Sequence, residues 1–170
     1  MQKQEGVSPI PLPKWLGMFY ASRDGSLQDR HRLCDQVFPS YLKTCSHLRL
    51  TKATQLSLIG EPSLRTYYRW TRLQREGISF QTPAHAELMC SALDVLEEVT
   101  RQGPRAAACE FLRSPTGRVP FKRQTPLTLL LRVNPSTNWA LWCLLRYPAD
   151  GAALLARMRA EALRFGVSSF

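Results

Sequence analysis

The amino-acid sequence predicts an all-α fold. Apolar residues make up 44% of the 170-residue chain, enough for a globular core, and in several segments they recur at the spacing of one helical face. Serine, threonine or proline residues precede these segments, and isolated glycine or proline residues follow them, as at the ends of helices. We therefore expect one helical domain, or one small domain with extensions.

Residues 1–25 are predicted to form an extended N-terminal arm, because prolines at positions 9, 11 and 13 favour extended backbone. Trp15 and Phe19 are too apolar for a free tail, so we expect them to pack on the domain or on a partner. A helix should begin near Ser26, a possible cap. Pro39 should interrupt it, and a second short helix should begin there.

A helix-turn-helix is predicted between residues 50 and 72. Thr51 can cap a short first helix, Gly60-Glu61-Pro62 breaks it, and Ser63 can cap a second helix. The expected apolar side of the second helix consists of Leu64, Tyr67 and Tyr68. Two short helices joined by a tight glycine turn are typical of this motif, whose second helix enters the DNA major groove.

The exposed side of the second helix would carry hydroxyl and guanidinium groups. The candidate DNA-binding residues are Ser63, Arg65, Thr66, Arg69 and Arg72. Guanidinium groups suit phosphate and the guanine edge, and hydroxyl groups suit phosphate. The sequence has no acidic residue between Pro62 and Arg75, so ion pairs within the helix do not explain the arginines. The alternative is two core helices whose arginines are merely solvated.

The rest of the chain predicts a small helical bundle. After a loop over residues 75–83, a long amphipathic helix should run from about residue 83 to residue 101. Its expected polar, solvated side carries Glu87, Asp94, Glu97 and Glu98. Shorter helices are expected over residues 105–112 and from Thr125-Pro126, with a final helix after Gly151.

Residues 133–148 allow two interpretations. They are either a buried helix capped by Ser136 or Thr137, or a strand paired with the preceding leucines through a turn. The helical spacing of Trp139, Trp142 and Arg146 favours the helix.

A second basic region lies in a loop of the C-terminal half that contains glycine and proline. The candidate partner-binding residues are Arg113, Arg118, Phe121, Lys122 and Arg123, together with Trp139 and Trp142. Tryptophan is enriched at protein interfaces, although the two tryptophans could equally be core residues. The basic loop could instead clamp a DNA backbone or be simply solvated.

Net charge and cysteine usage narrow the function classes. The formal charge of +10 favours an anionic partner, most commonly nucleic acid. The five cysteines are widely spaced and form no CxxC or CxH pair, which indicates buried thiols rather than a zinc site or disulfides. The sequence has no recognisable catalytic triad or glycine-rich phosphate loop, so we expect neither an enzyme nor a cofactor. It also lacks a signal peptide and a membrane-spanning stretch, which predicts a cytoplasmic protein.

The order of these pieces resembles antitoxins of the Xre/MbcA/ParS type over about residues 50–131. The matching residues are Leu56, Leu58, Ile59, Gly60, Arg65, Tyr68, Arg69 and Trp70, then Phe111 to Pro115, then Phe121, Thr125, Pro126, Leu127, Leu129 and Leu130. The resemblance implies a helix-turn-helix followed by a small helical toxin-binding domain. It also implies a partner, a RES-domain toxin that consumes NAD. One extra residue between Gly60 and Trp70, Leu56 in place of a small alanine, and the segment 133–148 depart from the family pattern.

We therefore predict an extended arm (1–25), a helix-turn-helix domain (26–80) and a helical partner-binding and dimerisation domain (81–170). The predicted function is that of an antitoxin-like transcriptional regulator, which binds double-stranded operator DNA as a homodimer and neutralises a toxin by direct binding. The alternative is a protein-interaction inhibitor from a mobile element or phage, which keeps the helix-turn-helix only as a scaffold.

Overall fold

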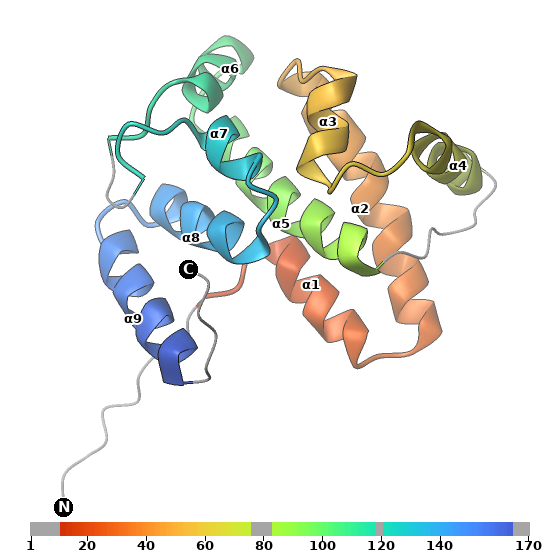
Figure 1. Ribbon diagram of the computed structural model, residues 1–170, viewed down its shortest axis with the longest axis horizontal. Coiled ribbons are helices and arrows are strands. Elements are labelled where there is room, and N and C mark those ends of the chain that lie inside the picture. Colours follow the sequence, from red (N-terminus) through yellow and green to blue (C-terminus); the bar gives the residue numbers. More distant parts are fainter. Residues whose placement is uncertain (1–10, 76–82, 118–120, 165–170) are drawn as a thin grey trace, which may run out of the picture.

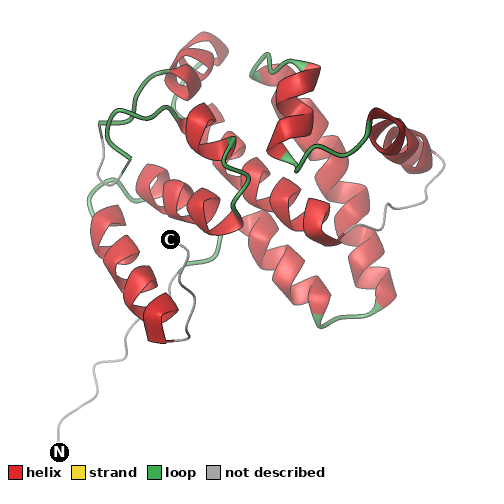
Figure 2. Ribbon diagram, viewed as in Figure 1, coloured by secondary structure: helices red, strands yellow, loops and turns green. Residues whose placement is uncertain are grey.

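The computed structural model of the protein describes residues 11–75, 83–117 and 121–164. Every regular element among these residues is an α-helix (Figures 1 and 2), which confirms the predicted all-α fold. The helices are α1 (Lys14–Arg23), α2 (Leu27–His47), α3 (Lys52–Leu58), α4 (Leu64–Arg75), α5 (Pro83–Thr100), α6 (Arg105–Arg113), α7 (Pro126–Leu130), α8 (Pro135–Arg146) and α9 (Gly151–Arg164). The predicted loop over residues 75–83 lies almost entirely outside the described residues.

Helix α5 is the central element of the fold and runs through the middle of the molecule in Figure 1. It packs against α1, α2 and α8, and it also contacts α3 and α6. Its apolar residues Met89, Leu93 and Leu96 are fully buried. One continuous hydrophobic core therefore includes residues from both predicted domains. The domain boundary at residue 80 itself stays a prediction.

The prediction of an extended arm is wrong for residues 14–23, which form helix α1. Trp15 and Phe19 are buried on the domain, as expected, because α1 packs on α5. The N-cap residue Pro13 supplies no side-chain hydrogen bond. Instead, Asp94 of α5 accepts the backbone N–H groups of Trp15 (2.9 Å) and Leu16 (2.8 Å). Local sequence could not indicate this helix, because its cap lies 79 residues away from Trp15.

Two of the four acids predicted on the solvated side of α5 are buried. Asp94 and Glu98 are each only 4% exposed. Asp94 caps α1. Oε2 of Glu98 lies 2.8 Å from Nη1 of Arg101, and Oε1 of Glu98 lies 4.0 Å from Nη1 of Arg146 in α8. Helices α1 and α8 cover this side of α5 and exclude water from it. The hydrogen bonds and ion pairs of Asp94 and Glu98 therefore replace the water that these carboxylates lose on burial.

Helix α2 is continuous, so the predicted interruption at Pro39 is wrong. Proline removes one backbone donor and crowds the preceding turn, at a cost of about 3 kcal/mol in a helix interior. Pro39 lies on the exposed side of α2, whereas Val37, Phe38 and Tyr41 are fully buried. Packing of that buried side keeps the chain helical through the proline.

Residues 135–146 form helix α8, so the favoured helical interpretation is confirmed. The predicted cap, Ser136 or Thr137, is wrong, because the helix is capped by Asn134. The side chain of Asn134 accepts the N–H groups of Ser136 (2.9 Å) and Thr137 (3.2 Å). Trp142 and its neighbours Leu141 and Leu144 are buried. This helix therefore contributes its tryptophan-rich segment to the core.

Candidate nucleic-acid interface

The segment from α3 to α4 has the two helices and the tight turn that the sequence predicts. Thr51 caps α3 by accepting the N–H of Thr54 (3.2 Å), and Ser63 accepts the N–H of Thr66 (3.1 Å) at the start of α4. Between the helices, Gly60 has φ of +82°, and an added Cβ would lie 3.1 Å from Cδ1 of Leu88. The turn therefore requires glycine both for its backbone conformation and for its close approach to α5.

Helix α4 is held to the protein by two aromatic residues on its inner side. Tyr67 and Trp70 are each only 2% exposed, and both rings make edge-to-face contacts with Phe38 of α2, at 5.7 and 6.2 Å between centroids. His85 of α5 lies 5.4 Å from the Trp70 ring. The same histidine makes a 2.6 Å hydrogen bond, through Nδ1, to the carbonyl of Ile59. These contacts fix both the turn and the helix on the edge of the molecule (Figure 1).

The predicted apolar side of α4 is partly wrong. Leu64 is 55% exposed and Tyr68 is 56% exposed, whereas the buried residues are Tyr67 and Trp70. An edge helix buries only a narrow strip, and residues three apart are enough to fill it. Leu64 and Tyr68, four residues apart, are instead exposed apolar side chains.

The outer side of α4 carries the predicted basic residues. Arg65, Arg69 and Arg72 are all exposed, and the helix contains no carboxylate. Ser63 is exposed and Thr66 half-buried, but Ser63 donates a 2.9 Å hydrogen bond to the hydroxyl of Thr66 while it caps the helix. The two hydroxyls therefore have a structural role at the start of α4, and the arginines provide its positive surface.

Lys52 of α3 is a further basic residue at this surface, and the sequence reasoning missed it. Its Nζ lies 4.7 Å from the ring centroid of Tyr67 and 4.5 Å from that of Tyr68. These three residues border a groove of about 510 Å³ between α2, α3 and α4, which we call the α3–α4 groove. Nothing in the local sequence pairs a lysine with tyrosines fifteen and sixteen positions later, so only the fold shows this arrangement.

The predicted partner-binding residues of the basic loop do not form one surface. Arg113 is exposed but donates hydrogen bonds to the carbonyls of Cys109 (2.8 Å), Leu48 and Arg49 (both 3.4 Å), so it fastens α6 to the end of α2. Phe121 is buried. The remaining candidates are Lys122 and Arg123, which are exposed, and Arg118, which lies outside the described residues.

The two tryptophans predicted for partner binding pack in the molecule. Trp142 is buried, with its ring edge-to-face against Tyr147 at 5.9 Å. Trp139 is half-buried, and its Nε1 donates a 2.9 Å hydrogen bond to the carbonyl of Pro11. Both side chains therefore have intramolecular partners, which favours the core interpretation.

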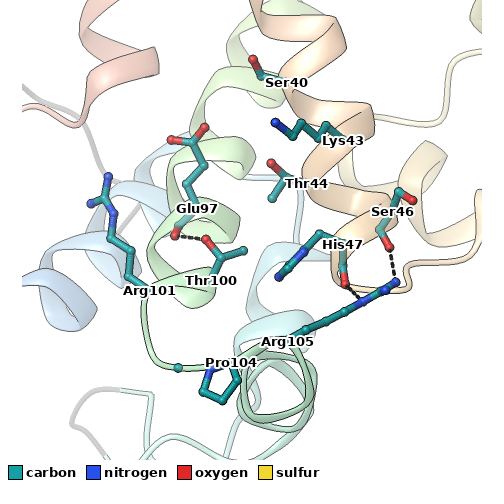
Figure 3. Close-up of a pocket in the computed structure, with 11 residues that line it drawn as sticks. Ser40, Lys43, Thr44, Ser46, His47, Glu97, Thr100, Arg101, Pro104 and Arg105 are labelled. Carbon is teal, nitrogen blue, oxygen red and sulfur yellow. Dashed lines mark hydrogen bonds between the residues drawn. The ribbon is translucent and has the colours of Figure 1, made fainter.

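A second groove, of about 780 Å³, lies between the ends of α2 and α5 and the start of α6 (Figure 3). Arg105 crosses it and donates hydrogen bonds to the carbonyls of His47 (2.8 Å) and Ser46 (3.1 Å). Arg101 pairs with Glu98, and both Glu97 and Lys43 line the groove. This groove has mixed charge, and its arginines are used within the fold, so we assign it no ligand.

Comparison with protein-family models, with curated protein sequences and with solved structures found no match to this chain. Among the helices described, none combines the length and apolar character needed to cross a membrane. Within the same residues, no group of three or more His, Cys, Asp or Glu side chains is arranged to hold a metal ion. The α3–α4 surface is therefore the best-defined candidate site, and its chemistry suits an anionic ligand.

Proposed function

We propose that α4 is the DNA-contacting helix of a transcriptional regulator. The observation that carries this proposal is the two-sided character of α4: Tyr67 and Trp70 anchor it, while Arg65 and Arg69 project from the opposite side without a carboxylate on the helix. A short exposed helix with guanidinium groups fits the major groove, where arginine can bind phosphate or the guanine edge. The formal charge of +10 supports binding to a polyanion.

The proposal extends to an antitoxin-like role on the strength of the family resemblance. Helices α6 and α7 follow α4 and α5 in the order that the resemblance requires, and Thr125 caps α7 by accepting the N–H of Thr128 (3.0 Å). In this proposal a homodimer binds a palindromic operator, and the C-terminal half holds a protein partner, which would be a RES-domain toxin. Among the described residues of the basic loop, Lys122 and Arg123 are exposed and are the candidates for contact with this partner.

DNA binding is tested by measuring the affinity for a duplex from upstream of the chain's own gene at two salt concentrations. Arg65→Ala combined with Arg69→Ala should weaken binding at low salt by about 30-fold or more, because each guanidinium contact contributes about 1 kcal/mol or more. The matched control is Lys14→Ala combined with Arg159→Ala, which removes the same charge from α1 and α9. That control should bind as the wild type does.

Absence of binding at low salt would reject the regulator, and so would equal affinity of the wild type and the Arg65/Arg69 variant. One observation favours the alternative protein-interaction inhibitor: Leu64 and Tyr68 of α4 are exposed large apolar side chains. If α4 contacts a protein instead of DNA, Leu64→Ala and Tyr68→Ala should reduce partner capture while the arginine variant retains it.

A further inference from the structure

We propose that the α3–α4 groove binds a phosphate of the nucleic-acid backbone, and that Lys52 supplies the positive charge for it. This inference rests on the proposed DNA binding and adds a contact outside the predicted recognition residues. It assigns a role to Lys52 of α3 and to the exposed Tyr68 of α4.

The floor of the groove consists of polar groups that are engaged within the protein. The hydroxyl of Tyr67 donates to Oε1 of Gln55 (2.9 Å), and Nε2 of Gln55 donates to the carbonyl of Leu50 (2.9 Å). The hydroxyl of Thr71 donates to the carbonyl of Tyr67 (3.2 Å). The bond from Tyr67 to Gln55 joins α4 to α3, and the other two bonds fix Gln55 and Thr71 on their own segments, so the polar groups of the groove are held in place.

The rim of the groove positions Lys52. The rings of Tyr67 and Tyr68 are nearly perpendicular, at 82°, with 6.2 Å between their centroids, and the ammonium group lies over both. A lysine side chain is otherwise flexible, and its ammonium has three donors. The two rings hold the ammonium at the groove, and three donors are more than two ring contacts can occupy, so one is available to an acceptor.

The chemistry around Lys52 favours an anion. The described residues that line the groove include Lys52 and Arg72 and no acid. Lysine binds phosphate as a point charge, which a backbone contact needs because it requires no base recognition. Tyr68 belongs both to the groove and to the exposed side of α4, so a nucleic-acid strand that contacts α4 also passes the opening of the groove.

The test compares the salt dependence of duplex binding among variants of the full chain. Each phosphate contact contributes about 0.9 to the slope of log K against log salt concentration. Lys52→Ala should therefore lower the magnitude of the slope by about 0.9 and leave the preference for the upstream duplex over a scrambled duplex unchanged. Lys43→Ala, an exposed lysine of α2 in the other groove, is the matched control and should keep the wild-type slope.

Tyr68 is tested as a positioning residue for Lys52. Tyr68→Ala keeps the formal charge but removes a ring that holds the ammonium in place, so it should weaken binding by up to about threefold, the upper limit set by one exposed cation–π contact. Tyr68→Phe keeps the ring and should restore binding. In the Lys52→Ala background, Tyr68→Ala should have no further effect, because the two residues then act as one unit.

The outcomes separate this inference from the function on which it rests. If the wild type binds the duplex and the Arg65/Arg69 variant does not, while Lys52→Ala keeps the full slope, the groove assignment is overturned and the regulator stands. If the wild type binds neither duplex at low salt, both proposals are overturned. The unfolding temperature of each variant should stay within about 4 °C of the wild type, because Lys52 and Tyr68 are exposed and their ring contacts are weak.

Discussion

Asp94 connects the first helix of the protein to its central helix. Both of its carboxylate oxygens accept backbone N–H groups at the start of α1, where the first turn of a helix otherwise has unpaired donors. Burial raises the pKa of Asp94 to about 7, against the opposing effect of the hydrogen bonds from Trp15 and Leu16, which favour the charged form. Stability should therefore depend on this one side chain and on pH.

We expect Asp94→Asn to destabilise the protein by about 1–3 kcal/mol. The amide oxygen can accept one N–H, but the NH₂ group then faces the second N–H and leaves it unpaired. Urea unfolding at a fixed pH measures this change. Asp35→Asn, on the exposed side of α2, is the matched control and should remain within about 0.5 kcal/mol of the wild type.

Comparison of the wild type with Asp94→Asn also gives a prediction for the pH dependence of stability. A carboxyl group with a pKa raised from 3.8 to about 7 in the folded state binds its proton more tightly there than in the unfolded chain. Its contribution to stability is complete below the unfolded pKa and is lost as pH rises through the folded pKa. The free energy of unfolding of the wild type relative to Asp94→Asn should thus fall between about pH 4 and about pH 7, by at most about 1.4 kcal/mol per pH unit. A difference that is flat across this range would contradict the shift.

At the scale of elements, helix α6 is fastened to the end of α2 by one arginine at each of its ends. Arg105 donates to the carbonyls of Ser46 and His47, and Arg113 donates to those of Leu48 and Arg49. The last carbonyls of a helix lack intrahelical partners and carry partial negative charge. The two arginines therefore satisfy consecutive acceptors where α2 ends and the chain turns toward α3.

Arg105→Ala should destabilise the protein by about 1–2 kcal/mol and raise amide hydrogen exchange in α6. Arg105→Lys should restore only part of the loss, because an ammonium cannot reach two carbonyls in the fork geometry of a guanidinium. Lys43→Ala, in the same groove, controls for the removal of a positive charge. Equal exchange rates in α6 for Arg105→Ala and the wild type would show that the arginine does not fasten the helix.

Most caps made by neighbouring residues were predictable from the sequence, and elements governed by distant contacts were not. Thr51, Ser63 and Thr125 each cap a helix by accepting the backbone N–H of the residue three positions later, so these caps can be predicted from local sequence. Helix α1 could not be found in this way, because Asp94 caps it from another part of the chain. The path of α2 through Pro39 likewise depends on tertiary packing.

The candidate site shows the same division. The exposed arginines of α4 follow from helical spacing, and their exposure is confirmed. Which apolar residues of α4 are buried depends on where α2 and α5 meet it, so the prediction for Leu64 and Tyr68 failed. Lys52 was missed because its contact with the two tyrosines exists only after the turn at Gly60 brings α3 and α4 together.

At the scale of the whole molecule, α5 supplies buried surface to helices from both predicted domains. It packs on α1 and α2 before it in the chain and on α8 after it. We therefore expect thermal unfolding in a single cooperative transition, with the calorimetric enthalpy equal to the van't Hoff enthalpy. A fragment of residues 1–80 should not fold, because α1 would lose the helix on which Trp15 and Phe19 are buried. Two separate transitions, or a folded fragment, would instead support independent domains.

The cap on α1 also has a consequence for the order of events during synthesis. Trp15 leaves the ribosome 79 residues before the side chain that receives its N–H. At about 5–20 residues per second, this corresponds to a wait of roughly 4–16 s. During that time α1 lacks both its cap and the part of its apolar cover that α5 supplies, so chaperones can bind Trp15, Leu16 and Phe19 until α5 emerges. Helix α1 therefore cannot reach its native place before α5 has been synthesised, although α1 precedes α5 in the chain with three helices between them.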